Sequence, residues 1–246
     1  MKILVCISKA PDTTSKIAFK DNNTAFDENG VQFIVNPYDE WYALVRAIEL
    51  KEAQGGSVTT ITVGGADNDP IIRKALAIGA DDAIRVDMEA TDAFQVASEI
   101  AAKAKEGGFD LVLCGKETIN NNGAVVGGML AELLDAPYIP LATKLDVSGT
   151  TAEITRDIAG GEEVLTAQLP VVISAAKGMA EQRIPNMRGI MAARSKALNV
   201  AAPAGTEAST EVKSYSLPPA KGDCTYIDAE NPAELIKKLH EEAKVI

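Results

Sequence analysis

The sequence predicts an α/β protein with a mostly parallel sheet, helices on both faces, antiparallel edge strands and an extended C-terminal arm that ends in a helix. Three observations predict this class. Apolar runs alternate with helix-like segments through the first two-thirds of the chain, which is typical of βαβ units. Short strand-like runs separated by glycine turns follow after Leu141. A stretch without a core pattern then leads to a terminal segment with a strong helix start.

The strands expected in the first part are apolar runs, as in strands that are covered on both faces. They span residues 2–7, 57–63, 83–86 and 109–114. A helix is expected to open at Asn36-Pro37, because Asn is a good N-cap and Pro suits the first helical position. Asp69-Pro70 repeats that signal. The expected helices run from Asn36 to Gly55, Asp69 to Gly79, Thr91 to Gly107, and Gly123 to Leu134.

The pattern changes after Leu141. Four short strands are expected at residues 143–147, 151–158, 163–168 and 171–174, with turns at Ser148-Gly149 and Gly160-Gly161. Strands this close together are joined by hairpins. They therefore predict an antiparallel or mixed edge of the sheet.

The chain loses a clear core pattern after Gly178. Residues 201–210 and 217–222 are rich in Ala, Pro, Gly and polar side chains and are expected to be linkers. The last helix has a cap at Asn231, proline at position 232 and an apolar face of Leu235, Ile236, Leu239 and Ala243. Because a short amphipathic helix needs tertiary contacts, this face must either fold back or pack on another subunit.

Composition excludes several classes of function. The net charge of −11 argues against nucleic acid as a general partner, because phosphate backbones require a basic surface. No apolar run approaches the ~18 residues of a membrane span, and the N-terminus has no signal-peptide pattern. The three cysteines, Cys6, Cys114 and Cys224, are widely spaced, which favours free thiols in a reducing cytoplasm.

Catalytic constellations are missing from the sequence. The single histidine, His240, lies in the terminal helix beside lysines. Gly115-Lys116-Glu117-Thr118 resembles the tail of a phosphate-binding P-loop, but Asp110 stands where that motif needs its first glycine. There is no nucleophile–base pair and no metal-ligand spacing. The chain is therefore expected not to be an enzyme by itself and to hold no metal.

Ligand-binding candidates follow the carboxyl ends of the expected strands, where open parallel sheets bind ligands. The four places are the end of the first strand at Cys6, the helix start at Asn36, Pro37, Tyr38, Asp39 and Glu40, the next strand end at Val63, and the loop from Gly115 to Val126. Each precedes or opens a helix.

The loop from Gly115 to Val126 suits an anion best. Free N–H groups near Gly123, Ala124, Val125 and Val126 would point at a phosphate with the helix dipole behind them. Asn120, Asn121 and Asn122 add donors and acceptors without negative charge. The alternative is a surface turn with an Asn-rich cap.

A basic, apolar segment lies at residues 181–196 of this otherwise acidic chain. Its cations include Arg183 and Arg188, and Ile184, Met187, Ile190 and Met191 are interleaved with them. Basic residues around flexible apolar ones predict a docking surface for an acidic protein partner. The pattern is equally consistent with an ordinary helix whose apolar side lies in the core.

Several segments resemble the electron transfer flavoprotein beta (small) subunit. They are MKILVCISKAPDT at the start, VNPYDEWYALVRAIELKE, RKALAIGADDAIRV, FDLVLCGKETI and, most specifically, ITRDIAGGEEVLTAQLPVVIS. The last contains a basic residue, a glycine pair, an acidic residue and Leu-Pro before an apolar run, which is similar to the family signature. The resemblance covers residues 1–196 and, more loosely, the arm.

The resemblance implies a Rossmann-like sheet and a heterodimer with a larger alpha subunit that binds most of the FAD. It implies AMP with a structural role in this chain, in a pocket formed at the same four strand ends. Electrons would come from acyl-CoA dehydrogenases or related flavoenzymes of fatty acid beta-oxidation and would pass to a membrane quinone oxidoreductase. The family's recognition loop falls on residues 181–196, with its anchor at Met187. No membrane insertion is implied.

The resemblance also predicts the domain division and leaves alternatives open. Residues 1–185 are expected to form the α/β nucleotide-binding domain, and residues 186–246 a docking helix and an arm that packs on the partner subunit. Asn120, Asn121 and Asn122, Ala159 and Ser8 depart from the family pattern. One alternative is a bifurcating electron transfer flavoprotein with a second FAD in this pocket and NADH as donor. Another is a stand-alone adenine-nucleotide-binding protein, which would lack the arm and docking loop.

Overall fold

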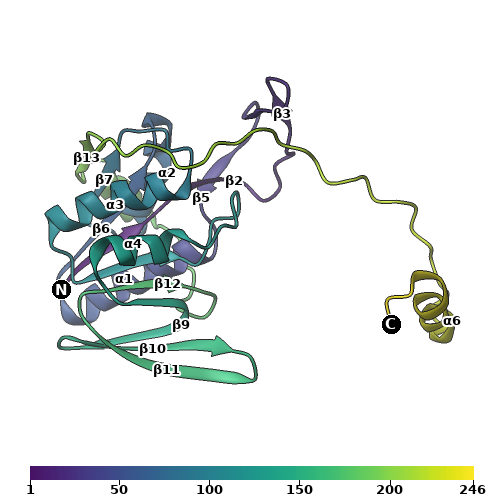
Figure 1. Ribbon diagram of the computed structural model, residues 1–246. Helices are drawn as coiled ribbons and strands as arrows, with labels where there is room; N and C mark the ends of the chain where they lie inside the picture. The colour runs from purple at the N-terminus through teal and green to yellow at the C-terminus, as the bar shows by residue number, and fades with distance from the viewer.

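The computed structural model describes all 246 residues and contains one nine-stranded sheet with helices on both faces (Figure 1). The strand order is β11-β10-β9-β12-β8-β1-β6-β7-β13. These strands are β1 (Lys2–Cys6), β6 (Ser57–Val63), β7 (Asp82–Val86), β8 (Leu111–Gly115), β9 (Tyr138–Ser148), β10 (Thr151–Ile158), β11 (Gly161–Gln168), β12 (Val171–Ala175) and β13 (Leu198–Ala201). The predicted α/β class, with its mostly parallel sheet and antiparallel edge, is confirmed.

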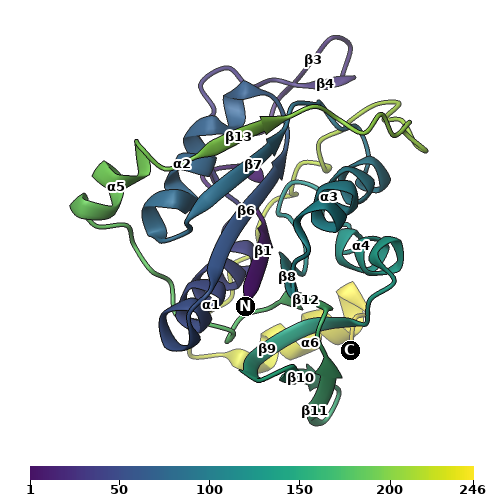
Figure 2. The ribbon, with the colours of Figure 1, turned by 90° about the vertical axis from the view of Figure 1, so that its left-hand side faces the viewer.

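Helices cover the two faces of the sheet in pairs. The helical elements are α1 (Asp39–Gln54), η1 (Ala66–Asn68), α2 (Asp69–Ile78), α3 (Ala93–Gly107), α4 (Val126–Leu134), α5 (Met187–Ala193), α6 (Pro232–Lys238) and the π-helical turn η2 (Leu239–Ala243). Figure 2 shows α1 and α2 on one side of the strands and α3 and α4 on the other. Two small antiparallel pairs, β2 (Lys9–Pro11) with β5 (Phe33–Val35) and β3 (Phe19–Lys20) with β4 (Ala25–Phe26), lie between β1 and α1 in the chain.

The alternation of side chains along β1 divides the core into two layers. Ile3 and Val5 belong to the larger apolar cluster, with the buried residues of α1 and α2. Leu4 and Cys6 belong to the second cluster, with buried residues of α3 and α4. Both sets are buried because successive residues of a strand point to opposite faces. This explains why β1 is a continuous apolar run rather than an alternating one.

The edge strands differ from expectation at one place. β12 was expected in the antiparallel or mixed edge, but it lies inside the sheet and is parallel to both β8 and β9. All five of its residues are buried, which is the reason for its unbroken apolar run. The antiparallel edge consists of β9, β10 and β11 alone. Because β9 begins at Tyr138, it also includes the residues just before the expected start of the edge.

Helix starts also differ from the sequence expectation. α1 begins at Asp39, and its cap position is Tyr38, with φ of 65°, so Asn36 is not the N-cap. Thr91 is not the cap of α3 either, because Asp92 caps it and accepts a hydrogen bond from the Gln95 N–H. α4 begins at Val126 rather than Gly123. The left-handed backbone of Ala124, with φ of 52°, prevents a helix there.

The segment after α5 was not predicted to pair. β13 joins the sheet parallel to β7, with Leu198 opposite Ala83 and Ala201 opposite Val86. The chain then crosses α3, where Glu99 accepts hydrogen bonds from the backbone N–H groups of residues 204–206. The first part of the expected linker is therefore attached to the body of the protein.

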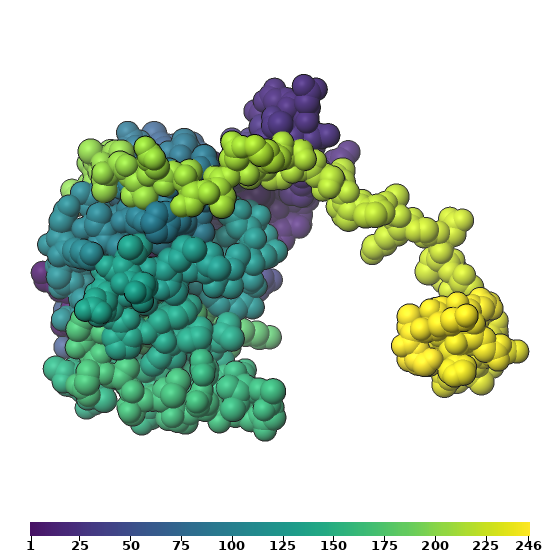
Figure 3. All heavy atoms as spheres, in the orientation of Figure 1, coloured from purple at the N-terminus to yellow at the C-terminus, as the bar shows by residue number.

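The arm leaves the body beyond Tyr215, whose ring stacks on Phe19 at a centroid distance of 4.9 Å. Figures 1 and 3 show an extended chain that ends in a helix standing away from everything else. No residue of α6 is buried. The helix was expected either to fold back on its own chain or to pack on another subunit. In the structure it does not fold back. None of the helices is both long and apolar enough to cross a membrane.

Candidate functional site

The strand order predicts a crevice between the carboxyl ends of β1 and β8. These strands are parallel neighbours. The chain leaving β1 leads to α1 on one face, whereas the chain leaving β8 leads to α4 on the opposite face. Adjacent strands whose connections go to opposite faces open a crevice at their carboxyl ends, which is where α/β sheets bind ligands. Three of the four predicted loops, those at Cys6, Asn36 and Gly115, meet at this crevice.

Asn36 connects the three loops. Its side chain is fully buried, its Nδ2 donates to the Glu117 carbonyl at 3.1 Å, and its Oδ1 accepts from the Ile119 N–H at 3.0 Å. Its own N–H donates to the Ser8 carbonyl at 3.0 Å. The side chain predicted as a helix cap therefore holds the loop after β8 against the loop after β1.

Glu40 completes this framework. The sequence places it at the end of the candidate helix start, with a role only at the positive end of the helix dipole. Its carboxyl oxygens accept from the Ser8 N–H at 2.7 Å and pair with the Ser8 hydroxyl at 2.8 Å. A Cβ on Gly115 would lie 3.0 Å from the Glu40 backbone nitrogen, so β8 passes α1 with no room for a side chain. In the sequence Glu40 is indistinguishable from any acidic residue of a first helical turn. Only its burial sets it apart.

Two carboxyl groups at the start of α1 are electrostatically unusual. Burial raises the pKa of Glu40 to about 8, against the lowering effect of its Ser8 hydrogen bonds. Burial also raises the pKa of Asp39 to about 6, while the nearby Lys116 ammonium lowers it. Perturbed carboxyl groups that line a crevice are typical of functional sites. The base of this crevice is therefore less negative at neutral pH than its acidic residues suggest.

The end of the loop from Gly115 to Val126 offers backbone donors, and Lys116 at its start is the loop's one cation. The N–H groups of Asn121 and Asn122 donate to the Thr118 carbonyl and close a turn. The N–H groups of Gly123 to Val126 donate no hydrogen bond within the chain. A Cβ on Gly123 would meet only a Val125 methyl, at 3.7 Å. Unpaired N–H groups in open space at the start of α4 fit the phosphate of a nucleotide.

The remaining predicted residues contribute less. The Cys6 side chain is buried, and burial raises its pKa well above the ordinary value, so only its backbone faces the crevice. Val63 ends β6 beside β1. At the following Gly64, an added Cβ would lie 2.4 Å from the Asn68 amide nitrogen. This corner is therefore filled by protein. Pro37 is half-buried, and Tyr38 is exposed.

The basic, apolar segment forms a separate surface on α5. Ile184, Met187 and Met191 are 80%, 74% and 57% exposed, and Ala193 is the only buried residue of α5. The alternative, an ordinary core helix, is wrong for that reason. Arg188 is exposed, whereas Arg183 forms a bidentate ion pair with Glu52 at 2.8 and 3.0 Å.

α5 is held on α2 by close backbone packing. A Cβ on Gly189 would lie 2.3 Å from the Ala77 carbonyl oxygen, and Arg73 donates to the carbonyls of Ala193 and Lys196. A cavity of about 600 Å³ lies between the two helices. Its walls are Pro70, Arg73, Lys74, Ala77, Pro185, Ile190, Ala193 and Arg194. This is the surface that an apolar, acidic-flanked partner segment would fit.

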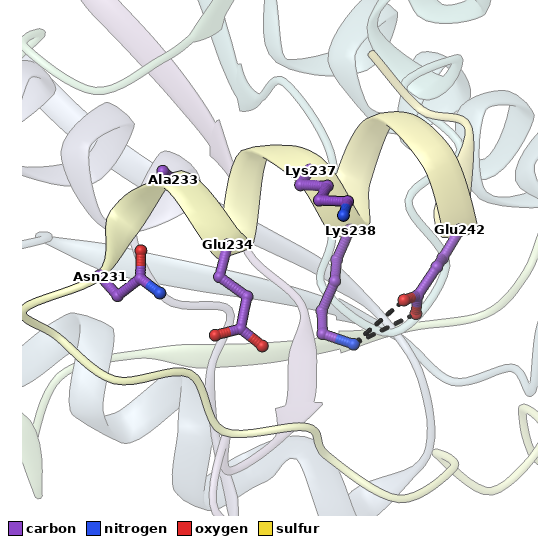
Figure 4. A pocket seen from close by; sticks show the side chains of 6 residues that line it. All are labelled: Asn231, Ala233, Glu234, Lys237, Lys238 and Glu242. Carbon is purple, nitrogen blue, oxygen red and sulfur yellow. Dashed lines mark hydrogen bonds and ion pairs between the residues drawn. The ribbon is translucent and has the colours of Figure 1, made fainter.

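A second hollow lies along α6, far from the crevice (Figure 4). Its six lining residues include a single hydrophobic one, Ala233, and Lys238 pairs with Glu242 across it. It is one side of an isolated helix and lacks the apolar walls of a small-molecule site. It therefore plays no part in the candidate site.

Comparison with known proteins gives a consistent result along the whole chain. The family model described as "Electron transfer flavoprotein domain" matches residues 23–205. The electron transfer flavoprotein subunit beta of Bacillus subtilis is 35% identical over 260 residues, which cover 100% of both chains. That of Syntrophomonas wolfei is 36% identical over 243 residues, covering 98% of this chain and 95% of the relative. The human subunit is 30% identical over 253 residues, covering 100% and 99%. On these full-length similarities, the chain belongs to the electron transfer flavoprotein beta-subunit family.

Proposed function

We propose that this chain is the small subunit of a heterodimeric electron transfer flavoprotein and holds AMP in the crevice between β1 and β8. In this proposal it accepts electrons from acyl-CoA dehydrogenases or related flavoenzymes in the cytoplasm. They pass through the FAD of the larger subunit to a quinone oxidoreductase. The chain itself is a carrier subunit rather than an enzyme. The observation that carries the proposal is that three strand-end loops meet at Asn36, and that the longest of them leads to the unpaired N–H groups of Gly123 to Val126.

The residues of the crevice have separate parts in holding AMP. The N–H groups of Gly123 to Val126 would bind the phosphate, and Asn120 to Asn122 would form the exposed rim. Asn36 would act indirectly, by fixing the loop that contains those donors. Neutral donors suit a structural nucleotide, because binding then needs no cation and no catalytic base. FAD on the larger subunit would supply the electron-accepting group.

A nucleotide inventory tests this proposal. The chain is co-expressed with its large subunit, the purified complex is denatured, and released FAD and AMP are quantified by chromatography. One FAD and one AMP per heterodimer are expected. Two FAD and no AMP would instead favour the bifurcating form, with NADH as donor. If no adenine compound is released beyond the large subunit's FAD, the crevice is not a nucleotide site.

We also propose that α5 and the residues before it dock the dehydrogenase, with Met187 as the anchor. Met187→Ala is expected to raise the dehydrogenase concentration for half-maximal electron transfer about tenfold, the effect of losing a moderate interface anchor. Because Met187 is 74% exposed, the unfolding temperature and bound nucleotide should not change. Transfer rates measured against dehydrogenase concentration provide the test.

Val164→Ala is the matched control for Met187→Ala. Val164 is 61% exposed but lies on β11, at the far edge of the sheet from α5. The Val164→Ala variant should transfer electrons at the wild-type rate at every dehydrogenase concentration. Equal rates for the wild-type complex and Met187→Ala would remove the anchor role.

In this proposal, residues 1–185 are the nucleotide-binding domain, and residues 186–246 are the docking helix and the arm that packs on the partner subunit.

A further inference from the structure

Two glutamates of this protein are deeply buried, and their surroundings are opposite in kind. Glu99 lies under the arm and accepts hydrogen bonds from the N–H groups of Ala204, Gly205 and Thr206. Burial raises the pKa of Glu99, but the three donors together lower it by a larger amount. The pKa of Glu99 therefore lies below its ordinary value. Three N–H donors without an opposing acceptor stabilise an anion. Glu99 is therefore a structural carboxylate.

Glu40 has only Ser8 as a polar partner and no cation. Its oxygens meet the Ser8 N–H and the Ser8 hydroxyl, and no ion pair involves it. The titratable groups that face it are Asp39 on its own helix, Cys6 on β1 and Cys114 on β8. All three are acids. Burial without a cation, among other acids, favours the neutral form of Glu40. The structure has the Ser8 hydroxyl donating to Glu40, and because a hydroxyl can also accept, the same contact can form with the neutral acid.

Glu40 also lies where the elements of the crevice meet. Ser8 is the first residue beyond the apolar end of β1, and its carbonyl accepts from the Asn36 N–H. Gly115, the last residue of β8, packs directly on the Glu40 backbone and Cγ. A change in the size or charge of Glu40 is therefore transmitted to both strand ends.

We propose that Glu40 is a positioning residue of the nucleotide crevice, which as a neutral acid holds the loop after β1 and makes nucleotide binding weaken with rising pH. This inference rests on the proposed nucleotide site. Glu40 is not assigned a contact with the nucleotide itself. It acts through Ser8 and through the backbone beneath Gly115.

The direction of the pH effect follows from linkage. Burial raises the pKa of Glu40 to about 8, so the carboxyl is neutral at pH 7 and ionises as the pH rises through 8. Ionisation adds a buried negative charge at the framework of a proposed anion site, and like charges disfavour each other. Nucleotide affinity should therefore fall between pH 7 and pH 9. If bound AMP raises the pKa of Glu40 by one further unit, the affinity for AMP falls by at most about tenfold over this pH range.

The experiment measures AMP affinity in the intact heterodimer after bound nucleotide has been removed. AMP is titrated calorimetrically at pH 7, 8 and 9, a range in which its phosphate, with a second pKa of about 6, is already doubly charged. Three variants are compared with the wild-type complex. Glu40→Gln keeps an acceptor and a donor but cannot ionise. Glu40→Ala removes both. Glu99→Gln is the matched control, because Glu99 is also buried but bonds to residues 204–206 of the arm.

The expected results separate a positioning role from a merely structural one. The wild-type complex and Glu99→Gln should lose AMP affinity severalfold from pH 7 to pH 9. Glu40→Gln should bind AMP as the wild type does at pH 7 and show a flat profile. Glu40→Ala should bind more weakly at every pH. If Glu40→Ala does not assemble, the pH profiles of Glu40→Gln and the wild type alone test the role of Glu40.

Each contrary result points to one claim. A flat wild-type profile, or a Glu40→Gln profile that falls with pH as the wild type's does, would overturn the role of Glu40. It would leave the nucleotide site itself in place. If the wild-type complex binds no AMP at any pH, and releases none on denaturation, the proposed nucleotide site fails and this inference fails with it.

Discussion

Removal of residues 217–246 is expected to abolish stable assembly with the large subunit. The apolar face of α6 includes Leu235 and Ile236, which are 46% and 60% exposed, and no residue of this helix is buried. Isolated helices shorter than about 12–15 residues are marginal in water, so α6 requires a surface that this chain does not supply. An arm with an unpartnered apolar helix at its end is typical of a segment that wraps a partner.

The position of the truncation matters because the arm begins on the body of the protein. Cutting before Ala201 would shorten β13 and remove the arm's backbone N–H groups that donate to the carboxylates of Asp92 and Glu99. Ending the chain at Ser216 keeps those contacts and the stacking of Tyr215 on Phe19. The truncated chain should therefore remain folded, and any loss of assembly can be assigned to the distal arm.

Size-exclusion chromatography of the co-expressed pair measures this result. The full chain should elute with the large subunit as one heterodimer, and the truncated chain should elute alone. Ile236→Asp should reproduce the loss, because it places a charge on the apolar face of α6. Glu241→Ala, on an exposed acidic residue of η2, is the control and should assemble normally. An intact heterodimer with the truncated chain would contradict the assembly role of α6.

Asn36→Ala is expected to cost about 2–4 kcal/mol of the free energy of unfolding and to release the bound nucleotide. Asn36 is fully buried, and its amide serves both the Glu117 carbonyl and the Ile119 N–H. Removing it leaves two backbone groups without partners, each at a cost of about 1–3 kcal/mol where they stay buried. The freed loop would no longer hold the N–H groups of Gly123 to Val126 in place.

Chemical denaturation and a repeated nucleotide inventory measure the two effects of Asn36→Ala. Asn36→Asp should fall between the wild type and Asn36→Ala, because its oxygen still accepts from Ile119 but faces the Glu117 carbonyl without a donor. Asn29→Ala is the matched control on an exposed turn, with an expected change within about 0.5 kcal/mol. A stable Asn36→Ala protein that retains its nucleotide would show that the loop is held by other contacts.

The strand and helix pattern could be predicted because each central element contains its own signal. β6 has the predicted bounds, and β1, β7 and β8 lie within one or two residues of theirs. A continuous apolar run is typical of a strand covered on both faces, and such a run can be recognised in the sequence alone. The terminal helix also begins at Pro232, as its cap and proline indicate. Elements without a periodic pattern, such as β13 and the small strands β2 to β5, gave no signal to find.

The sequence by itself determined the fold class, the family and the places where strands end, because periodicity, turn residues and family motifs are local. Only the tertiary structure decided how those places are used. Asn36, expected as a helix cap, links two loops in the structure. Glu40, whose sequence position suggests an exposed first-turn residue, is buried. The tertiary structure also left α5 and α6 with their apolar side chains exposed. Burial and partnership depend on which distant segments meet, and a linear pattern does not contain that information.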